Sequence, residues 1–443
     1  MTQDVNATLS FKNFGLSAKL LSSIEQRFQT PTPIQARVIP LAIQGKDVIG
    51  IAQTGTGKTL AFGIPLIEKL VATNGQGLIL LPTRELAIQV DEALRHIGQN
   101  LGLRTAVLIG GASNETQKKL LKRSPHLIVA TPGRLMDHLE QRNLDLRRIS
   151  MVILDEADRM LDIGFLPQIT RIFEKVPKVR QTLLFSATMP QAIVKIIHLY
   201  MKNPERVEVA PAGSTCNAID QSVFYISQDA KMPMLEKLLT DHSGTVLVFS
   251  RTKHGAKKMT AYLMSKGCRA AEIHSNRSLS QRKEALQGFK NGKYRVLVAT
   301  DIAARGIDVK NIELVVNYDL PDCSMDYVHR IGRTGRAGET GKAISFATHA
   351  QRRDIKDIER IMKKSIREVA APSNLKIEHR PEAVANEVAK IFYGRGKQFG
   401  NRGSNRFHGY RTTRGGGRGF SPKHQSSGFA RPKTTHAMTS RSA

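Results

Sequence analysis

Three arginines stand three residues apart in one glycine-flanked segment, YVHRIGRTGRAG, which runs from Tyr327 to Gly338. They are Arg330, Arg333 and Arg336, and His329 precedes the first of them. Residues at this spacing are neighbours on a helix, where like charges repel. Guanidinium groups placed together are suited to binding an anion through charge-assisted hydrogen bonds. The segment therefore predicts an anion site whose ligand comes from another part of the system.

A second segment has the composition of a phosphate-binding loop. It is AQTGTGKT, residues 52–59, and we expect it to open a helix. Gly55 and Gly57 let backbone N–H groups turn towards phosphate oxygens, Lys58 supplies a positive charge, and the Thr59 hydroxyl can ligate Mg²⁺. The first position is alanine where the strict pattern has glycine. The alternative interpretation is a glycine-rich turn with no function.

A third segment, VILDEAD at residues 152–158, places two carboxylates at the end of an apolar run. Asp155 is suited to orienting a metal ion and Glu156 to acting as a base for water, as hydrolysis of a phosphoanhydride requires. An acidic turn after a buried strand is common, so this segment is informative mainly because a phosphate loop lies upstream.

Short apolar runs that alternate with amphipathic stretches must position these residues. This rhythm predicts buried parallel strands and an α/β fold. The predicted strands are Gly77–Pro82, Leu127–Ala130, Met151–Leu154, Thr182–Phe185, Thr245–Phe249, Ala270–Ile273, Val296–Ala299, Ile312–Val316 and Ala343–Phe346. One predicted helix runs from Glu85 to Leu101.

The strands form two sets, separated by a small, polar segment that we interpret as a linker at residues 210–218. We therefore expect two tandem doubly wound parallel-sheet domains, at residues 9–210 and 219–368. Ligands of such sheets bind at the carboxyl ends of the strands, where the motifs above fall.

The charge of the chain indicates a polyanionic partner. Its 443 residues carry a formal net charge of +29, and no run of 18 apolar residues or secretory leader is present, which disfavours a membrane partner. Three widely spaced cysteines argue against a disulfide framework or a CxxC zinc site and favour a reducing, cytoplasmic compartment.

The last part of the chain differs from the rest in composition. No acidic residue follows Glu387, and the sequence from Gly394 is rich in Gly, Arg and Ser, which predicts a disordered tail at residues 388–443. Arginine and aromatic side chains together can stack on unpaired bases, so we interpret the tail as an RNA-binding arm. The alternative is an extension that only increases solubility.

Eight motifs, in order, resemble those of DEAD-box RNA helicases, and the chain is most similar to the bacterial RhlE-like group. They are QTPTPIQ (residues 29–35), AQTGTGKT, PTRELA (82–87), TPGR (131–134), DEAD (155–158), SAT (186–188), ATDIAARGID (299–308) and HRIGRTGR (329–336). The resemblance covers roughly residues 9 to 368.

The resemblance implies ATP and Mg²⁺ as cofactors, with two RecA-like domains around them. Gln35 is expected to contact the adenine edge, and Phe11 or Phe28 the base, although core packing is an equal alternative for both phenylalanines. Nucleotide contacts are further implied for Ala52, Gln53, Thr54, Gly55, Thr56, Gly57, Lys58, Thr59, Gly306 and Asp308. Catalytic roles fall to Lys58, Asp155, Glu156, Arg333 and Arg336, with Thr59 and Asp155 at the metal.

The resemblance also implies a nucleic-acid path and residues that couple it to the nucleotide. The path is expected to use Arg84, Gly110, Gly111, Thr131, Arg134, Phe249 and Thr300. Ser186, Thr188 and His329 are the expected coupling residues. In the family, Arg333 and Arg336 meet the γ-phosphate when the domains close, so ATP is the expected anion; for Arg330 an ion pair within its own domain remains an alternative.

Three positions depart from the family pattern. Arg27 stands where the family usually has glycine, and Ser275 and Leu279 stand where it has Gly and Gln. We expect these changes to alter RNA affinity rather than abolish activity.

The expected activity is RNA-stimulated ATP hydrolysis coupled to local, non-processive unwinding of short RNA duplexes or remodelling of ribonucleoprotein. The expected partners are structured or ribosomal RNA and proteins of ribosome assembly or RNA decay, with no membrane. Two alternatives stay open: a clamp that uses ATP only for grip, and a DNA translocase.

Overall fold

The structure, a computed structural model, describes residues 10–52, 55–73, 75–209, 219–304, 309, 312–335 and 340–372, without the side chains of Ile302 and Ala304. All of them belong to a unit at residues 1–394 that is distinct from residues 395–443. The predicted linker at 210–218 and tail at 388–443 lie outside the described residues. So do five predicted site residues: Gln53, Thr54, Gly306, Asp308 and Arg336.

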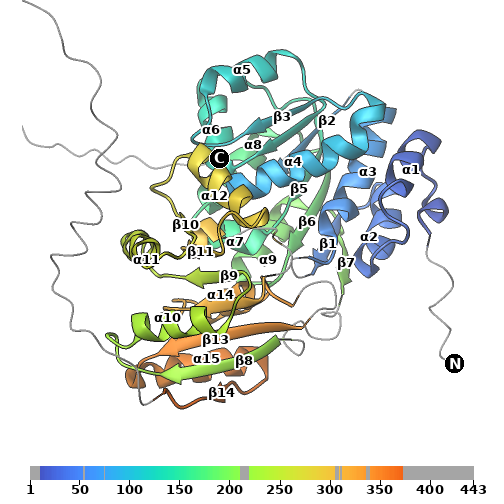
Figure 1. The fold of residues 1–443 in the computed structure, drawn as a ribbon. Helices are drawn as coiled ribbons and strands as arrows, with labels where there is room; N and C mark the ends of the chain where they lie inside the picture. The colour runs from blue at the N-terminus through green and yellow to red at the C-terminus, as the bar shows by residue number, and fades with distance from the viewer. Residues whose placement is uncertain are drawn as a thin grey trace, which may run out of the picture. The chain divides into compact units, whose positions relative to one another are not determined.

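Two parallel sheets of seven strands form the framework, and Figure 1 shows each with helices on both faces. The first has the order β3-β4-β2-β5-β6-β1-β7 and the second β10-β11-β9-β12-β13-β8-β14. The doubly wound parallel fold predicted from the alternating runs is therefore confirmed. Adding seven to each strand number of the first order gives the second order, so the two sheets have the same topology. Strands related in this way are called counterparts.

The first sheet consists of β1 (Val48–Ile51), β2 (Gln76–Leu80), β3 (Thr105–Leu108), β4 (Leu127–Ala130), β5 (Ile149–Leu154), β6 (Gln181–Ser186) and β7 (Glu205–Glu208). Its helices are η1 (Phe11–Phe14), α1 (Ala18–Glu25), α2 (Pro33–Ile43), α3 (Lys58–Ala72), α4 (Arg84–Gly98), η2 (Gln99–Leu101), α5 (Asn114–Lys122), α6 (Pro132–Glu140), α7 (Ala157–Asp162), α8 (Leu166–Lys175) and α9 (Gln191–Tyr200).

The second sheet consists of β8 (Ile219–Tyr225), β9 (Val246–Phe249), β10 (Ala270–Ile273), β11 (Val296–Ala299), β12 (Leu314–Asn317), β13 (Gly341–Ala347) and β14 (Arg367–Glu368). Its helices are α10 (Lys231–Asp241), α11 (Lys253–Ser265), α12 (Leu279–Lys290), α13 (Asp301–Ala304), α14 (Ser324–Ile331), η3 (His349–Gln351) and α15 (Arg352–Met362).

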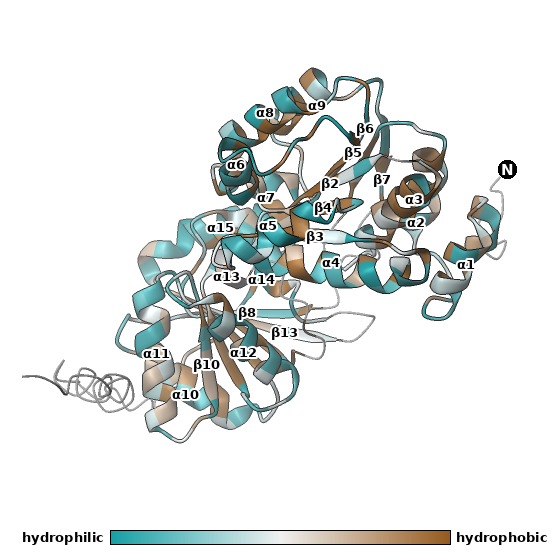
Figure 2. Ribbon diagram, turned by 90° about the horizontal axis from the view of Figure 1, so that it is seen from above, coloured by the Kyte–Doolittle hydropathy of each residue, from teal (hydrophilic) through white to brown (hydrophobic). Residues whose placement is uncertain are grey.

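Alternation along the strands divides each domain's core into two layers. In β4, Leu127 and Val129 pack with α1–α4, whereas Ile128 and Ala130 pack with α5–α9. Successive side chains of a strand point to opposite faces, so a strand apolar throughout must be covered on both sides. Figure 2 shows this as brown, apolar strands between helices that carry teal, polar residues. Among the described residues, no helix combines the length and apolar character needed to cross a bilayer.

The shared topology extends to the first residue of a helix in each domain. Lys58 begins α3, which follows β1, and Lys231 begins α10, which follows β8, the counterpart of β1. Both lysines are buried. The Lys231 ammonium lies 3.1 Å from an Asp319 carboxylate oxygen, just beyond β12, and 2.9 Å from the Tyr318 carbonyl oxygen.

Candidate functional site

The phosphate loop lies at the carboxyl edge of the first sheet, between β1 and α3. Gly55 and Gly57 have φ of +86° and +93°, a backbone region that favours glycine. A Cβ on Gly57 would lie 2.5 Å from Nε2 of Gln35 and 2.9 Å from Oγ1 of Thr32. The second glycine is therefore required both by its conformation and by the close approach of α2.

Lys58 is held by groups from two strand ends. Its Nζ donates to the Ala52 carbonyl oxygen at 2.9 Å and lies 3.8 Å from Oδ1 of Asp155. The β5, β6 and β1 strands are adjacent in the sheet, which brings the loop after β1 next to the carboxylates after β5. The structure thus brings together the loop and the acidic pair that the sequence predicted separately.

Asp155 and Glu156 are both buried, but their pKa values are shifted in opposite directions. Burial raises the pKa of Asp155 to about 6, although the Lys58 charge opposes the rise. Burial also acts to raise the pKa of Glu156, but the positive charges of Arg159, Lys58 and Arg333 together hold it below its ordinary value. Glu156 is therefore a carboxylate at neutral pH, and Asp155 changes charge in the mildly acidic range.

A buried arginine that the sequence analysis missed fixes Glu156. Arg159, 1% exposed, donates from a guanidinium nitrogen to Oε2 of Glu156 at 2.8 Å. Glu156 adopts a left-handed conformation with φ of +53°, directly before α7. The signal available in the sequence was the spacing of three between an acid and a base at a helix start.

The last Asp of the DEAD segment binds the SAT segment. Oδ2 of Asp158 accepts hydrogen bonds from the Ala187 N–H at 3.1 Å and from both the N–H and the hydroxyl of Thr188 at 2.9 Å. The Asp158 N–H donates to the Ser186 hydroxyl at 3.3 Å. Ser186 and Thr188 are thereby joined to the segment that carries Asp155 and Glu156.

Gln35 connects α2 to the phosphate loop. Its Oε1 accepts from the Thr32 N–H at 2.9 Å, and its Nε2 donates to the Gly57 carbonyl oxygen at 3.0 Å. A carboxamide has two donor hydrogens and two acceptor lone pairs, so one of each remains for a ligand. Of the two phenylalanines expected near the base, Phe11 is 1% exposed and packs in the core, as the alternative held, whereas Phe28 is 37% exposed.

Three of the predicted path residues of the first domain, Arg84, Gly110 and Gly111, lie together. Gly110 and Gly111 lie against the Arg84 side chain, since a Cβ on them would lie 3.1 and 2.5 Å from its terminal nitrogens. Thr131 and Arg134 are at the start of α6. Gln117, which the sequence analysis missed, holds the turn by accepting from the Ile109 N–H at 3.2 Å and donating to the Ile109 carbonyl oxygen at 3.1 Å.

Arg330 and Arg333, from the same arginine segment, make different contacts. Arg330 makes two bonds to the Asp301 carboxylate, at 2.5 and 2.7 Å, and also donates to Asn317 at 3.1 Å. It is 2% exposed. The ion-pair alternative therefore holds for Arg330, which supports its own domain.

Arg330 also packs over Phe249, one of the residues expected on the RNA path. Its guanidinium lies 4.9 Å from the centroid of the Phe249 ring, and Phe249 is 2% exposed. The ring packs in the core of the second domain, so a place for Phe249 on the RNA path stays a prediction that would use its backbone. Thr300, the other expected path residue here, directly precedes α13 and is half-buried.

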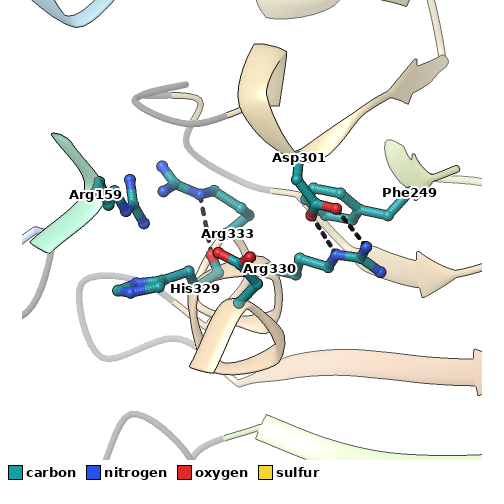
Figure 3. Close-up of a pocket in the computed structure, with 7 residues that line it drawn as sticks. Arg159, Phe249, Asp301, His329, Arg330 and Arg333 are labelled. Carbon is teal, nitrogen blue, oxygen red and sulfur yellow. Dashed lines mark hydrogen bonds and ion pairs between the residues drawn. The ribbon is translucent and has the colours of Figure 1, made fainter. Parts of the chain in front are cut away.

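Arg333 faces the first domain's acidic segment. Figure 3 shows Arg159 and Arg333 side by side at a small hollow of about 10 Å³, which Phe249, Asp301, Asp326, His329 and Arg330 also line. The Arg333 Nε donates to the His329 carbonyl oxygen at 3.2 Å. The positive charge of Arg333 reaches Glu156 closely enough to lower its pKa.

The departures from the family pattern also have defined places. Leu279 begins α12 and packs against the first domain's core cluster that includes α1–α4. Arg282, one turn further on, lies 2.8 Å from the Glu85 carboxylate, and both side chains are buried. Ser275 follows β10, and Arg27 lies between α1 and α2.

Comparisons with known proteins agree with this geometry. The DEAD/DEAH box helicase family model matches residues 32–196, and the helicase conserved C-terminal domain model matches residues 230–338. The chain is 41% identical to the ATP-dependent RNA helicase DbpA of Bacillus subtilis, over 88% of this chain and 86% of that one. It is 45% identical to the DEAD-box ATP-dependent RNA helicase CshA of Bacillus licheniformis, over 87% and 80%.

Among solved structures, Dbp5 of S. cerevisiae bound to RNA and ADP BeF3 is 30% identical and superposes with a TM-score of 0.73, over 86% of this chain and 99% of that one. The family models thus cover the phosphate loop, the DEAD segment and the arginine segment. The chain belongs to the DEAD-box ATP-dependent RNA helicase family.

Proposed function

We propose that this protein is an RNA-dependent ATPase that separates short RNA duplexes locally and non-processively. The observation that carries the proposal is the joined set of Lys58, Asp155 and Glu156, with Arg333 close enough to lower the pKa of Glu156. Such a set suits phosphoryl transfer, where catalysis consists of positioning and charge stabilisation.

In the proposed site, Lys58 leaves the Ala52 carbonyl oxygen and binds the β- and γ-phosphates of ATP. Backbone N–H groups at residues 52–59 surround the phosphates, since the glycine conformations at 55 and 57 turn the loop inward. Gln35, through its remaining donor and acceptor, and Phe28 contact the adenine. Gly306 and Asp308 contact the nucleotide from the second domain.

The donor groups present fit Mg²⁺ that arrives with ATP. The described residues contain no cluster of three or more His, Cys, Asp or Glu side chains that suits a metal. Mg²⁺ bound to nucleotides commonly uses one or two protein oxygens and keeps several waters. Thr59 and Asp155 supply such oxygens, and the bound ion would neutralise charge on the phosphates.

Glu156 is proposed to take a proton from the attacking water. It is ionised at neutral pH, and Arg159 fixes one of its carboxylate oxygens. Arg333 and Arg336 then stabilise the charge that builds on the γ-phosphate. Because these arginines belong to the second domain, hydrolysis depends on the approach of the two domains.

The RNA path is proposed to use Arg84, Gly110, Gly111, Thr131, Arg134 and Thr300. The buried bonds between Asp158 and the SAT segment support a coupling role for Ser186 and Thr188, and His329 is proposed to act with them from the second domain. Structured or ribosomal RNA is the proposed substrate, and the tail at 388–443 the proposed second RNA-binding element.

Three finer assignments also remain proposals. Membership of the RhlE-like group is supported by the motifs quoted above, whereas the relatives named here are DbpA and CshA. The cytoplasm as compartment is supported by Cys268 and Cys323, which are free thiols. Proteins of ribosome assembly or RNA decay are the proposed partners.

The proposed function predicts that ATP turnover rises strongly with RNA and far less with DNA of the same length. The expected stimulation by RNA is at least about tenfold, since closure completes the arginine contacts. Turnover should be measured with RNA, with DNA and without a polymer, together with strand release from a short RNA duplex. Equal stimulation by DNA would favour a translocase, and RNA binding without turnover would favour a clamp.

The raised pKa of Asp155 predicts a pH dependence. Only the carboxylate form can hold the metal, so turnover should fall as the pH decreases through about 6. Bound Mg²⁺ favours the ionised form, so a higher Mg²⁺ concentration should move the midpoint to lower pH. Rates at saturating ATP and RNA at two Mg²⁺ concentrations test this, and a profile independent of Mg²⁺ would contradict it.

A further inference from the structure

The amino edge of the first sheet, opposite the phosphate loop, carries a row of basic residues. Arg104 directly precedes β3, His126 precedes β4, Gly75 precedes β2 and Arg148 precedes β5. These strands are parallel and adjacent in the order β3-β4-β2-β5. The residues before them therefore lie side by side, although they are far apart in the sequence.

Backbone hydrogen bonds fix this row. The Arg104 carbonyl oxygen accepts from the His126 N–H at 2.8 Å, and the Arg148 carbonyl oxygen accepts from the Gln76 N–H at 2.9 Å. Gly75 admits no side chain, because a Cβ there would lie 2.4 Å from Oγ of Ser150. The three basic residues are therefore presented from a rigid edge, which lowers the entropic cost of binding a ligand.

A hollow of about 390 Å³ lies at this edge. Arg104, His126 and Arg148 line it together with an apolar wall made of Leu70, Val71, Leu101 and Leu103. Val71 is 49% exposed. None of the described residues that line the hollow is a carboxylate. We call Arg104, His126, Arg148 and this apolar wall the amino-edge site.

The charges at the amino-edge site act on one another. Burial lowers the pKa of His126, and the positive charges of Arg104 and Arg148 lower it further. The Nδ1 of His126 accepts from the Arg104 N–H at 3.2 Å, so the hydrogen of the neutral ring is on Nε2. The Arg104 guanidinium also donates to the Ser124 carbonyl oxygen at 3.2 Å, which holds that side chain beside the hollow. An arginine carries five N–H donors, so the site combines two guanidinium groups and a ring N–H donor in a region of positive potential.

The second domain shows that this arrangement is not a general result of the fold. Arg269 and Arg295 precede β10 and β11, the counterparts of β3 and β4, and line a hollow of about 430 Å³. Here Glu236 also lines the hollow, and Arg295 donates to the carbonyl oxygens of Leu239, His242 and Gly244. The second hollow thus has a carboxylate among its lining residues, which the described lining of the first hollow lacks.

We propose that the amino-edge site binds one nucleotide unit of RNA outside the main path, with its phosphate on Arg104, His126 and Arg148. The apolar wall then contacts the base or ribose. Cations beside an apolar wall suit a nucleotide better than an acidic peptide, whose carboxylates would leave that wall uncovered. This inference goes beyond the proposed function, since neither hydrolysis nor duplex separation requires the site.

The location explains how such a contact serves a helicase. Strands of 4 to 6 residues place the two edges of the sheet roughly 13–20 Å apart, at about 3.3 Å per residue. A short strand bound at the carboxyl edge does not reach the amino edge, but RNA that extends beyond the main path does. The site therefore distinguishes extended RNA from short RNA.

The test uses the full chain with Arg104→Gln and Arg148→Gln combined. Two labelled RNAs are compared: a short single strand that fills only the main path, and the same strand with a single-stranded extension. For extended RNA, the affinity should fall about tenfold at low salt, and the slope of log affinity against log salt should flatten by about 1.4, since each lost contact removes about 0.7. Short-RNA affinity and ATP turnover at saturating short RNA should not change.

The matched control combines Arg147→Gln and Arg206→Gln. It removes the same total charge from two exposed ion pairs of this domain, with Asp145 and Glu208. An equal loss of extended-RNA affinity in both double variants would show that only net charge matters, and would overturn the proposal. So would unchanged extended-RNA binding in the first variant.

A photocrosslinking residue at Val71 locates the contact directly. Extended RNA should crosslink there, and short RNA should not. Competition by polyglutamate without any RNA crosslink would assign the site to an acidic peptide instead. All substituted arginines are exposed and keep their backbone bonds, so the melting temperature should stay within a few degrees of that of the unmodified chain. If RNA does not stimulate ATP turnover in the unmodified chain, the proposed function is wrong. The amino-edge site is judged separately, by the RNA-binding and crosslinking measurements.

Discussion

Replacing Glu156 by glutamine should lower RNA-stimulated ATP turnover by at least about 10² while leaving ATP and RNA binding nearly intact. The substitution removes the proposed base, and the phosphate contacts of Lys58 and Thr59 remain. Because binding persists and turnover does not, the complex with ATP and RNA should accumulate. Single-turnover hydrolysis and equilibrium binding of a labelled nucleotide measure the two effects separately.

The buried partner of Glu156 makes a second measurement necessary. Glutamine keeps an oxygen that can accept from Arg159, but it leaves that guanidinium without a buried countercharge, which costs stability. The melting temperature should therefore be followed in the same variant. If turnover stays within a few-fold of the unmodified chain, Glu156 is not the base.

Replacing Arg333 by alanine should lower RNA-stimulated turnover by about 10³ or more, the range found for arginine fingers in phosphoryl transfer. The Nε of Arg333 donates to the His329 carbonyl oxygen, and the Arg333 charge reaches Glu156. Because the proposed contact with the γ-phosphate stabilises the transition state, its loss should affect the rate more than folding. The pKa of Glu156 should rise, since one of the charges that lower it is removed.

Arg330 provides the matched comparison, because it stands three residues earlier in the same segment. Arg330→Ala breaks a buried pair with Asp301 and should cost about 3 kcal/mol or more of folding free energy. Urea unfolding of both variants separates the two roles. If Arg333→Ala destabilises the second domain as much as Arg330→Ala does, Arg333 stabilises its own domain, and the proposed contact with the γ-phosphate is wrong.

The apolar runs predicted the strands well where a strand is buried on both faces. The predicted bounds agree with β4, β10 and β11, which are apolar or small except for the buried Glu272 of β10. Strands β3 and β7 are the two edge strands of the first sheet and were not predicted, because both contain polar residues. The sequence of β3 is TAVL, and that of β7 is ERVE, of which only the valine is buried. Strand β1 is only four residues long and directly precedes a glycine-rich loop, which hides its pattern.

The site residues that belong to a sequence motif could be predicted from that motif. Those whose position depends on packing between distant parts of the chain could not. Lys58, Asp155 and Glu156 came from local patterns. The packing of the Arg330 guanidinium over the Phe249 ring did not, because the two residues are far apart in the sequence. Arg159 and Gln117 were missed because each supports a motif from outside it. The amino-edge site was invisible in the sequence, because only the strand order makes its residues neighbours.

The shared topology of the two sheets has a consequence for how the chain arose. One strand order repeated twice, with a buried lysine opening the corresponding helix each time, is what duplication of an ancestral domain and later divergence produce. In both copies a carboxylate meets that lysine, at 3.8 Å for Lys58 and at 3.1 Å for Lys231. The two carboxylates also correspond, since Asp155 follows β5 and Asp319 follows shortly after β12, its counterpart. The buried lysine with its carboxylate is therefore an inheritance common to both copies, and the glycine-rich segment between β1 and α3 is what distinguishes the first copy.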